Sequence, residues 1–207
     1  MGAELLAQLA AEPSGSVEVV HLARRAVEAT PPVSVRVVDF AALDAVEVGA
    51  AEVGFCALGT TIAKAGSQAA FVQVDRDAVL AYAKLCQRAG AHTFVLVSSL
   101  GADPKSRVFY NRIKGDVEAE LAKLGFQHLV IVRPSVLDGA RSESRPGEAV
   151  AIVVMRVLSP LLVGGLRRYR PSPARQVAAA MRALARAPGT DRVRVVEAEE
   201  IPALAAG

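Results

Sequence analysis

Residues 93–114 of the chain read TFVLVSSLGADPKSRVFYNRIK, and this stretch decides the fold. Its first part, Thr93–Val97, is almost continuously apolar, without the alternation that marks a strand with one wet face. Such a run predicts a strand that is covered on both faces, as in a parallel sheet. Two serines, a loop and a segment of helical periodicity follow it. The stretch therefore predicts a strand that runs through a turn into a helix, which is half of a βαβ unit.

The alternation of strands and helices continues on both sides of this stretch. We expect helices over Ala3–Ala11, Gln68–Arg88, Val108–Leu124 and Arg175–Ala187, and further strands over Val17–Leu22, Val33–Phe40, Val53–Leu58, His128–Val132 and Val193–Ala198. This order predicts an α/β fold of Rossmann-like type with a mostly parallel sheet. Residues 1–207 are expected to form a single domain. Within it, the irregular segment Gly139–Arg170, which is rich in Pro and Gly, is expected on the substrate side.

The composition excludes several classes of protein. Hydrophobic residues make up 52% of the 207 residues and charged residues 22%, which is enough apolar material for a large core. The net charge of +3 is spread along the chain and aromatic residues are only 4%, so no nucleic-acid partner is expected. No apolar run approaches the roughly 20 residues that a membrane span needs.

The cysteines and histidines carry little chemistry of their own. Cys56 and Cys86 form no C-x-x-C motif and no disulfide framework, and His21, His92 and His128 stand alone. We therefore expect buried structural thiols and no metal site. Because the sequence does not open with a secretory signal, a reducing, cytoplasmic location is expected.

The side chains with the clearest chemistry are Tyr110 and Lys114. They are four residues apart on a predicted helix and so share one face. Ser99, or as a second choice Ser98, ends the strand before that helix, and the carboxyl ends of such strands line the ligand crevice. A phenol is a poor base at neutral pH, and a neighbouring ammonium favours its charged form. The alternative interpretation is a surface helix with a tyrosine and a solvated lysine.

Longer motifs surround these residues: Phe55–Gly66 (FCALGTTIAKAG), Val74–Asp77 (VDRD), Leu96–Asp103 (LVSSLGAD), Phe109–Glu120, Arg133–Leu137 (RPSVL) and Ser144–Glu148 (SRPGE). Together they resemble the short-chain dehydrogenase/reductases of the extended or atypical type. The closer resemblance is to the HTATIP2 (TIP30)-like family of NAD(P)-binding oxidoreductases. It covers most of the chain from Arg24 to Glu148. The resemblance implies NADP(H) as cofactor and a small carbonyl or alcohol compound as substrate.

The resemblance also assigns roles to residues. Tyr110 would be the acid/base and Lys114 its partner, which also holds the nicotinamide ribose, while Ser99 or Ser98 would orient the substrate. Arg24 and Arg25 match an arginine pair, and two guanidiniums suit the 2′-phosphate of NADP. The remaining cofactor-binding positions implied are Gly2, Asp39, Leu58, Gly59, Leu137 and Arg145. Without the resemblance, the arginine pair would read as a solvated strand end.

The start of the sequence departs from the family pattern. Such a fold should open with a strand and a glycine-rich turn that places the pyrophosphate on a helix N-terminus. Here the first strand and two of the glycines are absent, and Gly2 aligns with the third. The absent strand is central in the order 3-2-1-4-5-6. We therefore expect a divided sheet, an exposed groove or abnormal pairing, and weakened NADP binding in what would be a shortened version of a longer chain.

Three functions follow from these observations. The first is an NADP(H)-dependent oxidoreductase of short-chain dehydrogenase/reductase type. The second is a non-catalytic NADP-binding regulatory or scaffold protein, and the third is an incomplete domain with little cofactor affinity. Open strand edges would also favour a homo-oligomer.

Overall fold

A computed structural model describes residues 1–13, 15–29, 31–138 and 164–206. Residues 139–163, which make up most of the expected substrate-side segment, lie outside the described residues, and so does Arg145. Among the described residues, no helix is both long and apolar enough to cross a bilayer.

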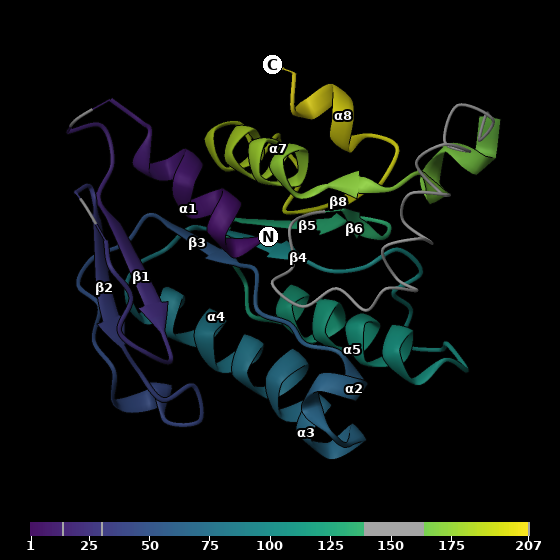
Figure 1. Ribbon diagram of the computed structural model, residues 1–207, viewed down its shortest axis with the longest axis horizontal. Coiled ribbons are helices and arrows are strands. Elements are labelled where there is room, and N and C mark those ends of the chain that lie inside the picture. The colour runs from purple at the N-terminus through teal and green to yellow at the C-terminus, as the bar shows by residue number, and fades with distance from the viewer. Residues whose placement is uncertain (14, 30, 139–163, 207) are drawn as a thin grey trace.

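A four-stranded parallel sheet forms the centre of the molecule (Figure 1). Its strands are β3 (Val53–Cys56), β4 (Thr93–Val97), β5 (His128–Arg133) and β8 (Val193–Glu197), hydrogen-bonded in the order β3-β4-β5-β8. Thr93 pairs with Val53 on one side and with His128 on the other. Every residue of β4 is buried, which confirms the doubly covered strand that its apolar run predicted.

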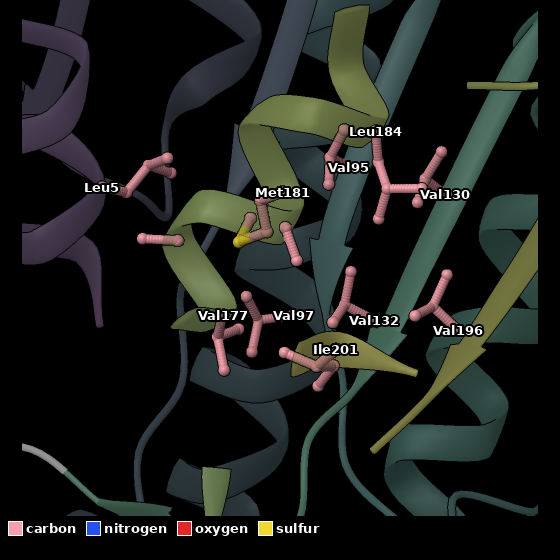
Figure 2. Packing of buried hydrophobic residues seen from close by; sticks show 12 residues of the cluster. Leu5, Val95, Val97, Val130, Val132, Val177, Met181, Leu184, Val196 and Ile201 are labelled. Atoms are coloured by element: carbon pink, nitrogen blue, oxygen red, sulfur yellow. The ribbon is translucent and has the colours of Figure 1, made fainter. Parts of the chain in front are cut away.

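Helices cover both faces of this sheet (Figure 1). On one face lie α1 (Gly2–Ala10), α7 (Ala174–Arg186) and the short α8 (Ile201–Leu204), and on the other lie α4 (Ala78–Arg88) and α5 (Phe109–Lys123). Figure 2 shows Val177, Met181 and Leu184 of α7 packed on alternate strand residues, with Leu5 of α1 beside them. The intervening residues, such as Phe94 and Leu96, pack with the α4 side. This alternation is what a strand of period two presents to two layers.

A second, two-stranded sheet stands apart from the first. It contains β1 (Val19–Ala23) and β2 (Val33–Val37), which pair in parallel with Val19 opposite Val33. Within the described residues, β1 pairs with β2 alone, and no strand is hydrogen-bonded between β1 and β3. The expected division of the sheet at this place is therefore confirmed.

Short elements connect these layers. They are η1 (Leu43–Ala45), α2 (Ile62–Ala65), α3 (Gln68–Val72), η2 (Gln73–Asp77), β6 (Leu137–Asp138), η4 (Gly164–Tyr169) and β7 (Ser172–Pro173). The helix predicted over Gln68–Arg88 is thus present over its whole length. It differs from the prediction in one respect, because η2 is a turn of π-helix between α3 and α4.

An ion-pair network ties α5 to the carboxyl ends of three strands. Arg133, at the end of β5, donates from Nη2 to Glu118 Oε2 at 2.5 Å and from Nη1 to Glu197 Oε1 at 3.0 Å. Hydrogen bonding to Glu118 raises the pKa of the Arg133 guanidinium further above its ordinary value. Ser98, after β4, donates to Glu118 Oε1 at 2.5 Å. Glu118 is buried and therefore depends on these partners for its hydrogen bonds.

Truncation of Glu118 should therefore destabilise the fold. Glu118→Ala leaves a part-buried guanidinium without its main partner, so we expect the free energy of unfolding to fall by about 2–4 kcal/mol. Urea denaturation followed by circular dichroism measures this change. The control is Glu120→Ala on the same helix, whose carboxylate pairs with Lys123 at the surface and should have no measurable effect. Equal effects of the two substitutions would contradict the prediction.

The two cysteines should be inert in the folded protein. Burial raises the pKa of the Cys56 thiol to about 12 and that of Cys86 to about 11. Because a raised pKa keeps the protonated form at pH 8, little thiolate is available to react. We expect no labelling by Ellman's reagent at pH 8 until the protein is unfolded, when both thiols should react. Rapid labelling of either thiol in the folded state would show that its burial is wrong.

Candidate active site

Tyr110 and Lys114 lie on consecutive turns of α5 and point to the same side of the helix. Tyr110 is half-buried, whereas Lys114 is only 6% exposed. The Lys114 ammonium lies 5.9 Å from the centre of the Tyr110 ring. At this distance a cation interacts favourably with the aromatic face.

A pocket at the carboxyl ends of β4 and β5 brings several of the expected residues together. Its volume is about 380 Å³, and it is lined by Ser98, Ser99, Leu100, Tyr110, Pro134, Ser135, Val136, Leu137 and Tyr169. All of these side chains are uncharged. Both candidate serines and the candidate tyrosine thus line one pocket, at the edge where parallel sheets bind ligands.

The hydroxyl groups of the two serines differ in their hydrogen-bond partners. Ser98 is buried, and its hydroxyl is engaged by Glu118. Ser99 is half-buried, and its one hydroxyl hydrogen bond among the described residues is a long one of 3.3 Å to the carbonyl of Leu100. Ser99 is therefore the serine whose hydroxyl can turn to a ligand at low cost, and Ser98 is better placed to hold the strand end.

Gly59 lies directly beside the lysine, in the loop after β3. A Cβ atom at this position would lie 3.7 Å from Lys114 Nζ and 3.3 Å from Asp75 Oδ1. Asp75 Oδ1 is itself 2.7 Å from Lys114 Nζ. Gly59 and the half-buried Leu58 therefore form a strand end at which the backbone, and not a side chain, faces the buried ion pair.

The other expected cofactor residues lie at neighbouring strand ends. Arg24 and Arg25 follow β1 and are exposed, and so is Asp39, which follows β2 and accepts a hydrogen bond from the Ala41 amide at 2.9 Å. Because Ala23 pairs with Val37, these strand ends share one edge. Gly2 begins α1 close to the end of β3, where an added Cβ would lie 4.0 Å from Ala57 Cβ. Among the described contacts, none joins Arg24, Arg25 or Asp39 to the pocket beside Tyr110.

Sequence reasoning missed four residues that shape the site: Asp75, Glu118, Gly115 and Tyr169. The signal for Gly115 was its place in the middle of a helix, where glycine is unfavourable. A Cβ there would overlap the backbone of Asp103 and Pro104, so glycine lets this loop pack directly on α5. Tyr169 belongs to the segment expected on the substrate side, and it lines the pocket. Metal chemistry finds no support in the described parts of the chain, where no three His, Cys, Asp or Glu side chains are grouped for an ion.

Comparison with known proteins identifies relatives in sequence, although no protein-family model matches the chain. The chain is 48% identical over 126 residues to protein HTATIP2 of Rattus norvegicus, an alignment that covers 60% of this chain and 52% of that protein. It is 36% identical over 155 residues to protein FMP52, mitochondrial, of Eremothecium gossypii, covering 74% of this chain and 69% of that protein. The chain thus spans about half the length of the HTATIP2 relative.

Solved structures share its fold. MoeE5 in complex with UDP-glucose and NAD superposes with a TM-score of 0.65 at 17% identity, over 99% of this chain and 77% of that one. The human epimerase family protein SDR39U1 with NADPH superposes with a TM-score of 0.60, also at 17% identity, over 93% of this chain and 69% of that one. At such identities the similarity establishes the Rossmann-like fold and nothing finer.

The comparisons correct the expected location. The FMP52 relatives from Eremothecium gossypii, Coccidioides immitis and Candida albicans are named mitochondrial, so the cytoplasmic location expected from the sequence is wrong. The physical reason is that two unpaired cysteines describe a reducing environment, which is not peculiar to the cytosol.

The 36% identity over more than two thirds of an FMP52 protein, the HTATIP2 similarity and the shared fold lead to one conclusion. The chain belongs to the HTATIP2- and FMP52-like family of atypical short-chain dehydrogenase/reductases.

Proposed function

We propose that the chain binds NADP(H) and is an oxidoreductase that interconverts a small carbonyl compound and its alcohol. One observation carries this proposal: Tyr110 and Ser99 line the same pocket, while Lys114, one helical turn from Tyr110, is buried beside Gly59. In this arrangement the phenol can supply a proton and the hydroxyl a hydrogen bond to one substrate oxygen, while the ammonium can stabilise the phenolate that is left.

The strand ends are suited to a dinucleotide. The backbone at Gly59 is exposed, so a dinucleotide can approach it closely. A side chain at this position would contact Asp75 and Lys114. The exposed guanidiniums of Arg24 and Arg25, at the end of β1, are suited to a phosphate group. MoeE5 and SDR39U1, which share the fold, have been crystallised with NAD and NADPH, and this supports a nicotinamide cofactor.

In the reducing direction, NADPH would supply, when bound, the hydride for a carbonyl carbon, and the residues of this chain would handle the proton and the oxygen. Tyr110 donates the phenolic proton to the carbonyl oxygen, and Ser99 holds that oxygen with a hydrogen bond. The Lys114 ammonium stabilises the phenolate that remains on Tyr110. Proton transfer by a positioned group of this kind contributes typically 10²–10⁴-fold to a rate.

The pocket favours a small and uncharged reacting end of the substrate. Its volume of about 380 Å³ is at the small end for ligand pockets, and none of the described residues that line it is charged. Leu100, Pro134 and Val136 supply apolar surface, which suits an aliphatic or aromatic aldehyde or ketone.

Replacement of Tyr110 tests the chemistry. In Tyr110→Phe we expect kcat for NADPH oxidation with a panel of aldehydes and ketones to fall at least about hundredfold, because the proton donor is lost. NADPH affinity should change only a few-fold. Absorbance at 340 nm measures turnover, and fluorescence titration measures binding. The matched control is Tyr82→Phe, a partly buried tyrosine of α4 that packs on Phe94 and should leave turnover unchanged.

The outcomes separate the three functions. NADPH binding without turnover in the unmodified chain would favour a regulatory or scaffold protein. Absence of both binding and turnover would favour an incomplete domain.

The arginine pair tests the choice of cofactor. The unmodified chain should bind NADP more tightly than NAD, and Arg24→Ala combined with Arg25→Ala should remove most of that preference. A charge-assisted contact to the 2′-phosphate contributes about 1.5–3 kcal/mol, or at least tenfold in affinity. Calorimetric titration with both dinucleotides measures the ratio. The control replaces the exposed Arg167 and Arg168, and equal affinity of the unmodified chain for NADP and NAD would refute this part of the proposal.

A further inference from the structure

Asp75 is a carboxylate on a buried helix face whose neighbouring positions are apolar. It lies on the buried face of the helical stretch 68–88, four residues after Phe71 and four before Val79, and both of these are core residues. Asp75 is only 1% exposed. Burial of a carboxylate is costly unless an opposite charge and hydrogen bonds compensate for the lost hydration. The groups that contact Asp75 therefore indicate its role.

Its two oxygens have different partners, and both partners belong to the candidate site. Oδ1 lies 2.7 Å from Lys114 Nζ. The approach does not meet hydrogen-bond geometry, so this contact is an ion pair of two buried charges. Oδ2 accepts a hydrogen bond from the Thr60 amide at 2.7 Å. One side chain thus connects the lysine of α5 to the loop after β3, next to Gly59.

The two helical segments meet in register along this face. Phe71 packs on Tyr110, with ring centres 5.5 Å apart, and Asp75 pairs with Lys114. Phe71 and Asp75 are four positions apart, and so are Tyr110 and Lys114. One turn of the 68–88 stretch therefore packs against one turn of α5. Asp75 itself belongs to the π turn η2, and such turns occur frequently at functional sites.

We propose that Asp75 is the positioning residue of the site: it holds the Lys114 ammonium and the Thr60 amide in one fixed arrangement toward the cofactor. This inference rests on the proposed NADP(H) function. Stability alone does not account for Asp75, because replacing a buried ion pair by apolar residues is often neutral or stabilising. A fixed ammonium beside an open glycine backbone, in contrast, requires a buried partner that the cofactor does not displace.

The first test measures Lys114 itself and needs no cofactor. Brief acetylation with acetic anhydride, read by mass spectrometry, should modify Lys114 slowly in the unmodified chain and several-fold faster in Asp75→Asn. The substitution keeps the size and shape of the side chain and removes its charge. The exposed Lys84 and Lys123 serve as internal references for the overall extent of acetylation. The matched control is Asp77→Asn, which removes an exposed carboxylate of the same π turn that pairs with Arg76. Equal acetylation of Lys114 in all three proteins would overturn the proposal.

The second test asks whether Asp75 acts through Lys114. Asp75→Asn should weaken NADPH binding about tenfold or more and lower kcat, whereas Asp77→Asn should change neither. In a Lys114→Met background, Asp75→Asn should cause little further loss of binding, because the group that it positions is gone. Additive losses, or an unchanged affinity in Asp75→Asn, would overturn the proposal. If the unmodified chain binds no NADPH, the proposed function fails, and the acetylation result alone decides the role of Asp75.

Discussion

Burial of β4 on both faces is the constraint on which the rest of the structure depends. A strand with no exposed residue needs a helical layer on each side, and its alternate residues supply the core for each layer. Polar residues can then follow only at its end, where Ser98 and Ser99 emerge at the edge shared with the ends of β3 and β5. The site is therefore placed by the same hydrophobic pattern that builds the sheet.

Three successive turns of helix α5 each place one polar side chain near this edge of the sheet. Tyr110, Lys114 and Glu118 lie along one face, and each is fixed by a different part of the fold. Phe71 packs on the first, Asp75 pairs with the second, and the third holds the ends of β4 and β5 through Ser98 and Arg133. Stability and the proposed function thus overlap on this face, because the contacts that hold α5 on the sheet also orient the candidate catalytic groups.

The sequence predicted the parts of this arrangement that depend on periodicity. The strands and the common face of Tyr110 and Lys114 follow from residue spacing, whereas the division of the sheet was predicted from the absence of the first strand of the family pattern. Asp75 and Glu118 could not be predicted in this way, because acidic residues in a helix usually face solvent. Their burial depends on partners 15 or more residues away and, for Asp75, on a π turn that composition does not reveal. The expected subcellular location was wrong because the features on which it rested, cysteine usage among them, describe a reducing environment rather than one compartment.

The division of the sheet sets a physical condition on ligand binding. Arg24, Arg25 and Asp39 belong to the β1–β2 sheet, whereas Gly59 and the pocket belong to the four-stranded sheet. Within the described residues, no strand pairing joins the two. Side-chain contacts do, for example the Arg88 guanidinium of α4, which donates to the Leu43 carbonyl after β2 at 2.9 Å. Such contacts deform more easily than a continuous ladder of backbone hydrogen bonds. A dinucleotide that contacted both sheets would therefore spend part of its binding energy on fixing their relative position.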